Sequence, residues 1–262
     1  MAQLIKLQDY ISRYEQNLTR YCNQFVRLKQ QRWQDKKEEA GITENSNATK
    51  VQSVKKQFLT DMFDNQLRWA SSTAFEKSLL DPQYETDQWL KKLLSELPDT
   101  YLLMYEPVFQ IAQAPVELEA ILIAPLEVYC LAFLKGEKDE IYQASSERFW
   151  TVWRDDKQEK VINPLISLRR SNAVLSRLIK KELPMKQLLI ATDGYVDHFY
   201  DWHIECIDKR NLQQWIREHA TNPRPMKSLQ IKVARELLNQ TRTEYYERID
   251  DSTISWEIEQ NH

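Results

Sequence analysis

The stretch from Val116 to Gly136 constrains the fold of this chain more than any other part of the sequence. It contains the two longest apolar runs, Ala120–Ala124 and Val128–Leu134, with Pro125 in the short segment between them. Each run is too short for an ordinary helix and is rich in Ile, Leu, Val and aromatic residues, which predicts two buried strands. Because proline has no N–H to donate to a sheet, Pro125 fits the turn that joins them.

Two acidic residues precede the first of these strands. The segment from Val116 to Glu119 alternates apolar and acidic side chains. If one strand runs over Glu117–Ala124, this alternation places Glu117 and Glu119 on the same face. Carboxylates entering a buried strand are costly without partners. We therefore expect a functional site, or what is left of one, at this point.

Composition excludes several classes of protein. The chain has 262 residues, of which 42% are hydrophobic and 29% charged, and it contains only three glycines. So few glycines favour a helix-rich protein. They also leave no phosphate-cradling loop, which argues against nucleotide-dependent enzymes of the common loop types. The net charge of −3 gives no general attraction to nucleic acid, so any basic surface must be local.

Cysteine usage and hydropathy indicate a cytoplasmic protein. The three cysteines Cys22, Cys130 and Cys206 are widely spaced and form no disulfide framework. The amino terminus has no apolar signal core, and no apolar run approaches the roughly 18 residues of a membrane helix. We expect a bacterial, cytoplasmic protein with no membrane partner.

The first 80 residues predict a helical hairpin. Apolar side chains follow a 3-4 spacing that predicts one helix over residues 3–39, and a polar loop from Gly41 to Thr49 separates it from a second helix over residues 49–80. This apolar seam could form a coiled coil with a partner or a second copy, or pack on the chain's own second helix. The seam consists of Leu4, Leu7, Ile11, Tyr14, Leu18, Tyr21, Phe25 and Leu28.

From residue 84 to 191 the predicted order is helix, three strands, two weak strands, helix and strand. The helices are 84–97 and 163–181, the latter announced by Asn163-Pro164, which can cap and start a helix. The predicted strands are Tyr101–Ile111, Glu117–Ala124, Val128–Leu134, Ile141–Gln143, Phe149–Trp153 and Gln187–Ala191. The first of them is expected to bend or end near Pro107. This order predicts an α/β (α+β) architecture with a small mixed sheet flanked by helices, followed by a mostly helical carboxy-terminal extension.

The region from 84 to 200 resembles the nuclease-related domain (NERD) family, which has the PD-(D/E)XK nuclease fold. Glu119, in Glu117-Leu118-Glu119-Ala120, stands where the family has the acid of its first catalytic strand, and Val128–Leu134 matches the next strand. Trp153 followed by Asn163-Pro164 resembles the segment that opens the family's second helix. Glu85 stands at the family's helix glutamate. The resemblance implies catalysis with Mg²⁺ held between two strands, for which Glu119 is the metal-ligand candidate.

The sequence departs from the family where the chemistry takes place. The second strand of the family carries Glu-x-Lys, but this chain has Ala132-Phe133-Leu134. Strand alternation predicts that Lys135 points to the opposite face. Only the remnant candidates Glu119, Glu117 and Glu85 are left, and no catalytic set is intact. The turn Asp155-Asp156-Lys157 offers an acid and a lysine elsewhere, as a relocated site.

The predicted helix from residue 163 carries a local basic excess. An active relative would use such a helix beside its cleft to hold phosphates. The alternative is a solvated helical face. The candidate nucleic-acid contacts are Arg169, Arg170, Arg177, Lys180 and Lys181. Further on, His203 and Cys206 have the spacing of half a zinc site but no second pair of ligands.

Together these features predict three parts: a helical region over 1–80, a nuclease-related core over 81–200 and a helical extension over 201–262. We expect an inactive nuclease relative that serves as an interaction or scaffold module without a cofactor. The first alternative is a Mg²⁺-dependent nuclease for DNA or RNA with a relocated site. The second is a protein that binds nucleic acid without cleaving it.

Overall fold

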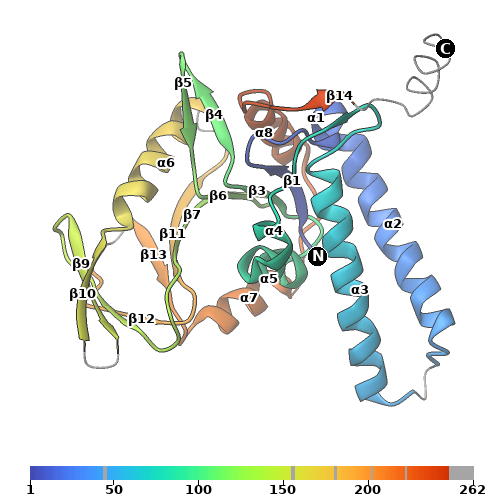
Figure 1. Cartoon of the computed structure of the whole chain (residues 1–262), viewed down its shortest axis with the longest axis horizontal. Helices are drawn as coiled ribbons and strands as arrows, with labels where there is room; N and C mark the ends of the chain where they lie inside the picture. Colours follow the sequence, from blue (N-terminus) through green and yellow to red (C-terminus); the bar gives the residue numbers. More distant parts are fainter. Residues whose placement is uncertain (44–45, 155–156, 180–181, 202, 222, 248–262) are drawn as a thin grey trace, which may run out of the picture.

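A computed structural model describes residues 1–43, 46–154, 157–179, 182–201, 203–221 and 223–247 (Figure 1). Its largest element is a mixed sheet with the strand order β1-β3-β6-β7-β11-β13. The strands β3, β6 and β7 form an antiparallel meander, and β1 and β11 add in parallel to β3 and β7. The bounds are β1 Gln3–Leu7, β3 Leu102–Tyr105, β6 Ala120–Ile123, β7 Val128–Leu134, β11 Met185–Ala191 and β13 Ile204–Ile207.

The two strands predicted from the apolar runs lie at the centre of this sheet. All four residues of β6 are buried, as are six of the seven in β7. The backbone N–H of Ala124 donates to the carbonyl of Glu127 at 2.9 Å and closes the turn around Pro125. Near-continuous apolar strands are expected where helices cover both faces of a sheet. The predicted α+β class with helices on a mixed sheet is therefore confirmed.

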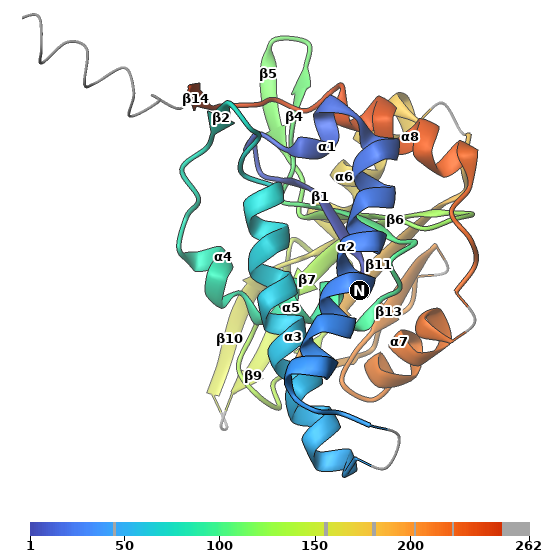
Figure 2. The same ribbon diagram turned by 90° about the vertical axis from the view of Figure 1, so that its right-hand side faces the viewer.

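Helices cover both faces of the main sheet. Side chains of α5 (Gln88–Glu96) and α7 (Leu212–Ala220) pack on one face. Those of α2 (Leu18–Glu39), α6 (Leu165–Leu178) and α8 (Ser228–Leu238) pack on the other. The second helix of the hairpin, α3 (Ala48–Trp69), contributes buried side chains to the cores on both faces of the sheet. It lies alongside α2 (Figures 1 and 2). Within the described residues no helix has the length and apolarity to cross a bilayer.

The prediction of one helix over residues 3–39 is wrong. Gln3–Leu7 form the strand β1, all five residues of which are buried. A short helix α1 (Arg13–Gln16) follows, and then α2 begins. Two polar caps divide the helices, since the side chain of Ser12 accepts from Tyr14 N and that of Asn17 accepts from Arg20 N. The 3-4 spacing of Leu4, Leu7 and Ile11 thus matches the helical period by chance.

Most of the predicted seam is used inside the chain. The side chains of Leu4, Leu7, Ile11, Tyr14, Leu18 and Phe25 are at most 6% exposed. Tyr21 and Leu28 are partly buried against the same core as Tyr14, Leu18 and Phe25. The hairpin of α2 and α3 agrees with the prediction. However, α3 ends at Trp69, and the chain then forms β2 (Glu76–Lys77), which pairs with β14 (Tyr246–Glu247). A boundary at residue 80 does not separate two cores, because β1 belongs to the main sheet.

Two predicted strands are each divided in two, the first of them at the bend or end predicted near Pro107. Tyr101–Ile111 divides into β3 and β4 (Val108–Ile111), with Glu106 at φ +51° between them. Glu117–Ala124 divides into β5 (Ala114–Glu117) and β6, and β5 pairs with β4 as a separate hairpin. Glu117 and Glu119 therefore do not share the face of one strand, and that prediction is wrong.

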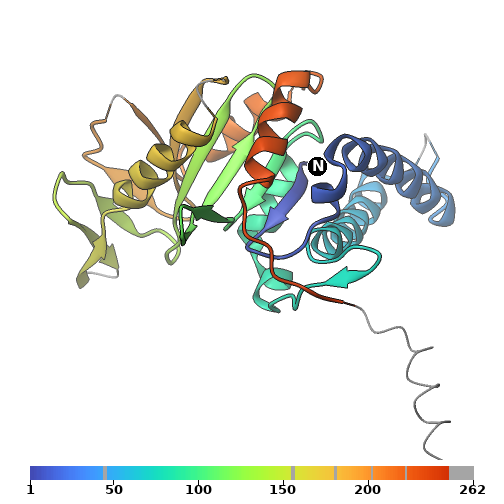
Figure 3. The same cartoon turned by 90° about the horizontal axis from the view of Figure 1, so that it is seen from above.

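A second sheet has four strands in the order β10-β9-β8-β12. In the chain, β8, β9 and β10 come between β7 and α6, and β12 comes between β11 and β13. Its strands are β8 Ile141–Gln143, β9 Phe149–Arg154, β10 Lys157–Ile162 and β12 Tyr195–Asp197. The predicted strands over Ile141–Gln143 and Phe149–Trp153 are confirmed. Figures 1 and 3 show β9 and β10 at the edge of the molecule farthest from α2 and α3. After this sheet, α6 begins beside Asn163, whose side chain accepts from Leu165 N.

Candidate functional site

Glu119 lies at the point where β6 and β7 stop pairing. The last backbone pair in this direction is Ala120 with Leu131. Beyond it, Glu119 Oε2 accepts the backbone N–H of Phe133 at 2.8 Å, and Oε1 accepts the hydroxyl of Ser167 at 2.6 Å. The carboxylate therefore continues the ladder where the backbone of β6 has left it and ties α6 to the sheet. Buried N–H groups require such an acceptor.

The residues at the family's second catalytic strand are packed into the core. Ala132 is 1% exposed and Leu134 is 7% exposed, and both belong to the cluster between the sheet and α6. They stand opposite Leu189 and Ala191 of the parallel strand β11. Neither offers an oxygen for a cation. The residues present therefore do not fit the Mg²⁺ that the family resemblance implies.

A lysine and a carboxylate meet on the other face of β7. The ammonium of Lys135 lies 5.9 Å from the centroid of the Phe133 ring. It is therefore on the face of β7 opposite to Ala132 and Leu134, as strand alternation predicts. It donates to the Tyr105 hydroxyl at 3.2 Å and lies 3.7 Å from Glu106 Oε1. At half exposure of its side chain, this ion pair contributes little to stability.

Glu106 connects this lysine to the end of β6. Its backbone N–H donates to the carbonyl of Glu119 at 2.7 Å, and its Oε2 accepts the Tyr84 hydroxyl at 2.5 Å. Burial and this hydrogen bond raise the pKa of Tyr84. The Tyr105 hydroxyl donates in turn to Asp87 Oδ2 at 2.7 Å. Hydrogen bonds and the ion pair between Lys135 and Glu106 thus join Glu106, Tyr84, Tyr105, Asp87 and Lys135 into one group, which we call the Glu106 cluster.

Glu117 lies near this cluster but outside it. Partial burial, and then repulsion from Glu106, raise the pKa of its carboxyl. The guanidinium of Arg170 acts in the opposite direction and donates to the Glu117 backbone carbonyl at 3.3 Å. The two sequence candidates Glu117 and Glu119 therefore have different surroundings, and only Glu119 contacts β7.

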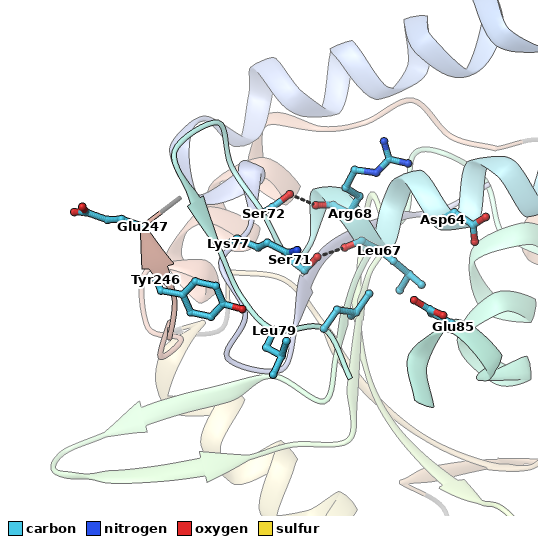
Figure 4. Close-up of a pocket in the computed structure, with 11 residues that line it drawn as sticks. Asp64, Leu67, Arg68, Ser71, Ser72, Lys77, Leu79, Glu85, Tyr246 and Glu247 are labelled. Atoms are coloured by element: carbon cyan, nitrogen blue, oxygen red, sulfur yellow. Dashed lines mark hydrogen bonds between the residues drawn. The ribbon is translucent and has the colours of Figure 1, made fainter. Parts of the chain in front are cut away.

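Glu85 faces a different part of the molecule. Its neighbour Tyr84, on the short helix α4 (Gln83–Thr86), is the residue that reaches Glu106. Glu85 instead points toward α3 and lines a pocket of about 1030 Å³ (Figure 4). That pocket also holds charges of both signs from Asp64, Arg68, Lys77 and Glu247. The structure thus does not bring the three remnant candidates together.

The basic helix is only partly available. Arg169 lies 3.5 Å from Asp201, although its side chain is 63% exposed. Arg170 contacts the Glu117 carbonyl, and Arg177 lines a shallow pocket together with Glu236. Lys180 and Lys181 lie outside the described residues, as do Asp155 and Asp156 of the turn proposed as a relocated site. Two of the described arginines therefore already have partners within the chain.

No group of three or more His, Cys, Asp or Glu side chains with the spacing of a metal site occurs in the part of the chain that the structure describes. Cys206, the cysteine of the half zinc motif, is a free thiol on β13. Burial raises the pKa of Cys206 to about 12, which keeps it a thiol at neutral pH. A thiol in this state is a poor metal ligand.

Sequence reasoning found Glu119 but missed Glu106. No motif marks Glu106, because it reaches the site through a left-handed backbone conformation after β3. The Glu-Pro pair at 106–107 is the available signal, since it ends the strand beside the acidic segment. The role of Ser167 follows only from the way α6 packs on the end of β6.

Comparisons with known proteins give little beyond this geometry. No family model matches the chain, and no solved structure matches it. One curated protein, an RNA 2',3'-cyclic phosphodiesterase of Geobacillus stearothermophilus, is 54% identical over 37 residues. The matched segment is 14% of this chain and 12% of that protein. A match of this length shows neither the family nor the activity of the chain.

Proposed function

We propose that this chain is a non-catalytic interaction module with a nuclease-like core. The observation that carries the proposal is the surroundings of Glu119. Both of its carboxylate oxygens accept hydrogen bonds from the chain itself, at Phe133 N and Ser167 Oγ. The positions that would complete a metal site are Ala132 and Leu134, which are buried and apolar.

The order of elements supports a nuclease-like core. In the main sheet and its flanking helices, α5 is followed by the antiparallel strands β3, β6 and β7, then α6, then β11 parallel to β7. The hairpin of β4 and β5 and the strands β8, β9 and β10 are inserted into this order. This is the order that the resemblance to the nuclease-related domain implies. The free, buried thiols of Cys22 and Cys130 suit a reducing compartment, so we place the protein in the cytoplasm. The 37-residue segment shared with the RNA phosphodiesterase assigns no activity to this chain.

A cleavage assay tests the proposal. The full chain is incubated with single-stranded DNA, duplex DNA and single-stranded RNA in Mg²⁺ or Mn²⁺, alongside Glu119→Ala and Glu119→Gln. We expect no metal-dependent cleavage above the level of the Glu119→Ala protein. Glu119→Gln controls for folding, because an amide oxygen can still accept from Phe133. Cleavage that both substitutions abolish in folded protein would overturn the proposal.

The Glu106 cluster favours one alternative, a nuclease with a relocated site. Glu106, Glu119 and Lys135 lie at one corner of the sheet, through the 2.7 Å backbone bond and the 3.7 Å ion pair. This alternative requires cleavage that is lost in both Glu106→Gln and Lys135→Met. Because Lys135 is half exposed, Lys135→Met should leave folding intact. Absence of cleavage in the unmodified chain would eliminate the alternative.

A further inference from the structure

The last turn of α7 contacts the main sheet through His219. The buried side chains Leu212, Trp215 and Ile216 pack α7 on the sheet, and His219 follows them near the end of the helix. Figure 1 shows α7 beside α5 at one end of the sheet. The partner of His219 in the sheet is Tyr129, the second residue of β7. This contact lies outside the sites at Glu119 and Glu106.

Both ring nitrogens of His219 have a polar partner. Nδ1 lies 2.7 Å from the backbone carbonyl oxygen of Trp215, and Nε2 lies 3.0 Å from the hydroxyl oxygen of Tyr129. A carbonyl oxygen can only accept, so Nδ1 carries a hydrogen. Turning the ring over would place carbon atoms at both contacts, so these two partners fix its orientation.

The Tyr129 hydroxyl has a second partner in Glu127. It donates to Oε1 of this carboxylate, and Lys186 Nζ lies 2.8 Å from Oε2. Burial alone would raise the pKa of Glu127, but hydrogen bonds from Lys186 and Tyr129 outweigh it and lower the pKa. Burial, and then the hydrogen bond to Glu127, raise the pKa of Tyr129. At neutral pH Glu127 is therefore a carboxylate, and Tyr129 is a phenol with one hydrogen.

The three contacts need one more proton than a neutral imidazole, a phenol and a carboxylate supply. The hydroxyl hydrogen of Tyr129 points to Glu127, so the phenol oxygen can only accept from Nε2 of His219. Because Nδ1 donates to Trp215, both ring nitrogens then carry hydrogen and the ring is an imidazolium. A neutral imidazole with its hydrogen on Nδ1 would set the lone pair of Nε2 against the phenol oxygen and lose this hydrogen bond.

The surroundings contain features that favour this positive charge. The indole of Trp215 stacks on His219, with ring centroids 4.1 Å apart and 30° between the planes, and aromatic faces attract cations. The last turn of a helix also stabilises a cation. Arg217, on the same turn, donates to the Gln213 carbonyl at 3.2 Å. The other ionisable groups around the contact are Tyr101, Glu205 and Glu218, together with Lys186 and Arg224, which oppose a further positive charge.

We propose that the contact between His219 and Tyr129 binds one proton, and that this proton holds the end of α7 to the main sheet. Above about pH 6.5 unfolding releases it, because a histidine in an unfolded chain loses its proton near that pH. The resulting stability is fully present below this pH and is lost as pH rises through the range in which the folded protein releases the proton. Docking of α7 is thus sensitive to pH, and this inference is independent of the proposed function.

Nitrogen NMR of the full chain labelled with ¹⁵N-histidine tests where the proton is. The His219 signals are those missing from His219→Gln. At pH 7.5 we expect the two similar nitrogen shifts of an imidazolium in the folded protein, and the separated shifts of neutral rings in concentrated urea. Backbone signals of α7 should change together with His219 as pH rises. A neutral His219 ring in the folded protein at pH 7.5 would overturn the proposal, as would α7 signals that stay constant while His219 loses its proton.

Glu127→Gln supplies the missing hydrogen without a charge. Its amide N–H can donate to the Tyr129 oxygen, whose hydroxyl then donates to a neutral His219, while the amide oxygen still accepts from Lys186. Relative to this variant, the folding equilibrium constant of the unmodified chain should fall by up to about tenfold per pH unit above about pH 6.5, the limit for one proton. Urea denaturation between pH 6 and pH 8.5 measures this ratio, in which the contributions of groups that both proteins share cancel. A ratio that stays constant over this range contradicts the proposal.

Glu218→Gln is the matched control, because Glu218 neighbours His219 on α7 but accepts from Gln214 Nε2 at 2.8 Å. It removes the same charge and should keep both the imidazolium signals of His219 and the pH dependence of the unmodified chain. If Glu218→Gln abolishes the pH dependence as Glu127→Gln does, general negative charge is responsible and the assignment to this contact is wrong.

Discussion

The two sheets of this molecule use similar strands for opposite purposes. In the main sheet β7 is buried on both faces, and its Ala132 and Leu134 fill the positions where chemistry would need charge. In the four-stranded sheet β9 alternates buried and exposed side chains, and its exposed positions are apolar. The difference indicates that the central strand has been given over to stability.

The largest expected effect comes from placing the same two charged residues in each sheet. Ala132→Glu with Leu134→Lys would introduce Glu-x-Lys into β7, and Thr151→Glu with Trp153→Lys would introduce it into β9. In β7 we expect a loss of about 3 kcal/mol or more in free energy of unfolding, because charges enter a packed core. On β9 we expect about 1 kcal/mol or less. Urea denaturation followed by circular dichroism measures both, and equal losses would contradict the comparison.

A smaller effect is expected at the end of β6. Glu119→Ala leaves the Phe133 N–H without its acceptor and breaks the bond to Ser167, whose hydroxyl keeps the Pro164 carbonyl at 2.9 Å as an acceptor. This should cost about 1–3 kcal/mol of unfolding free energy, and Glu119→Gln should cost less because one acceptor oxygen is kept. Glu117→Ala is the control and should change stability by about 0.5 kcal/mol or less. A loss with Glu117→Ala as large as that with Glu119→Ala would mean that the ladder contact is not what matters.

The link between the two sheets predicts a pH dependence. Asp208 follows β13 and accepts the backbone N–H of Val196 in β12 at 3.1 Å. Burial alone would raise the pKa of this carboxyl, but hydrogen bonds from Arg210 and Val196 outweigh it and lower the pKa below its ordinary value of 3.8. A lowered pKa in the folded state means stability that is present above the ordinary value and lost as pH falls through the folded pKa.

Asp208→Asn should therefore cost about 1–3 kcal/mol at pH 7 and much less at the acid end of the titration. Urea denaturation of both proteins between pH 7 and pH 3 gives the difference at each pH. Taking this difference removes the contribution of other carboxyls with a lowered pKa, such as Asp61. A difference that does not change with pH would show that the charge of Asp208 is not what holds β12 to the main sheet.

The smallest effect on stability is expected at Trp153, on the exposed face of the four-stranded sheet. Trp153→Ser removes a side chain that is 43% exposed. We expect unfolding free energy to change by about 0.5 kcal/mol, against the much larger loss expected for Trp150→Ser, whose side chain is 1% exposed. Thermal denaturation of the Trp153→Ser and Trp150→Ser proteins measures both losses. Similar losses at both positions would mean that the exposed face contributes to folding as much as the buried one.

The sequence predicted the centre of the fold better than its edges. Apolar runs identify β6, β7 and β11, and Asn163-Pro164 locates the start of α6, because these signals are local. β1 also fits a helical pattern, because Leu4 and Leu7 of this buried strand continue in a 3-4 spacing to Ile11 beyond it. β10 was missed because Lys157–Ile162 is polar, and only pairing with β9 makes it a strand.

The candidate site was predictable only where it depends on one strand. Glu119 and the apolar Ala132 and Leu134 follow from aligning residues along β6 and β7. Glu106 and Ser167 do not, because they reach the site through a left-handed turn and through the docking of α6. The separation of Glu117 from Glu119 depends on the hairpin of β4 and β5, which no local sequence pattern predicts.

The hydrogen bond between Glu119 and the end of β7 has a consequence for reading related sequences. A carboxylate that completes a backbone ladder is favoured by folding alone, with no contribution from chemistry. Selection for a stable protein would keep an acid at this position whether or not catalytic partners accompany it. An acidic residue aligned with Glu119 is therefore weak evidence of cleavage, and the residues aligned with Ala132 and Leu134 are the ones that would distinguish working enzymes from their inactive relatives.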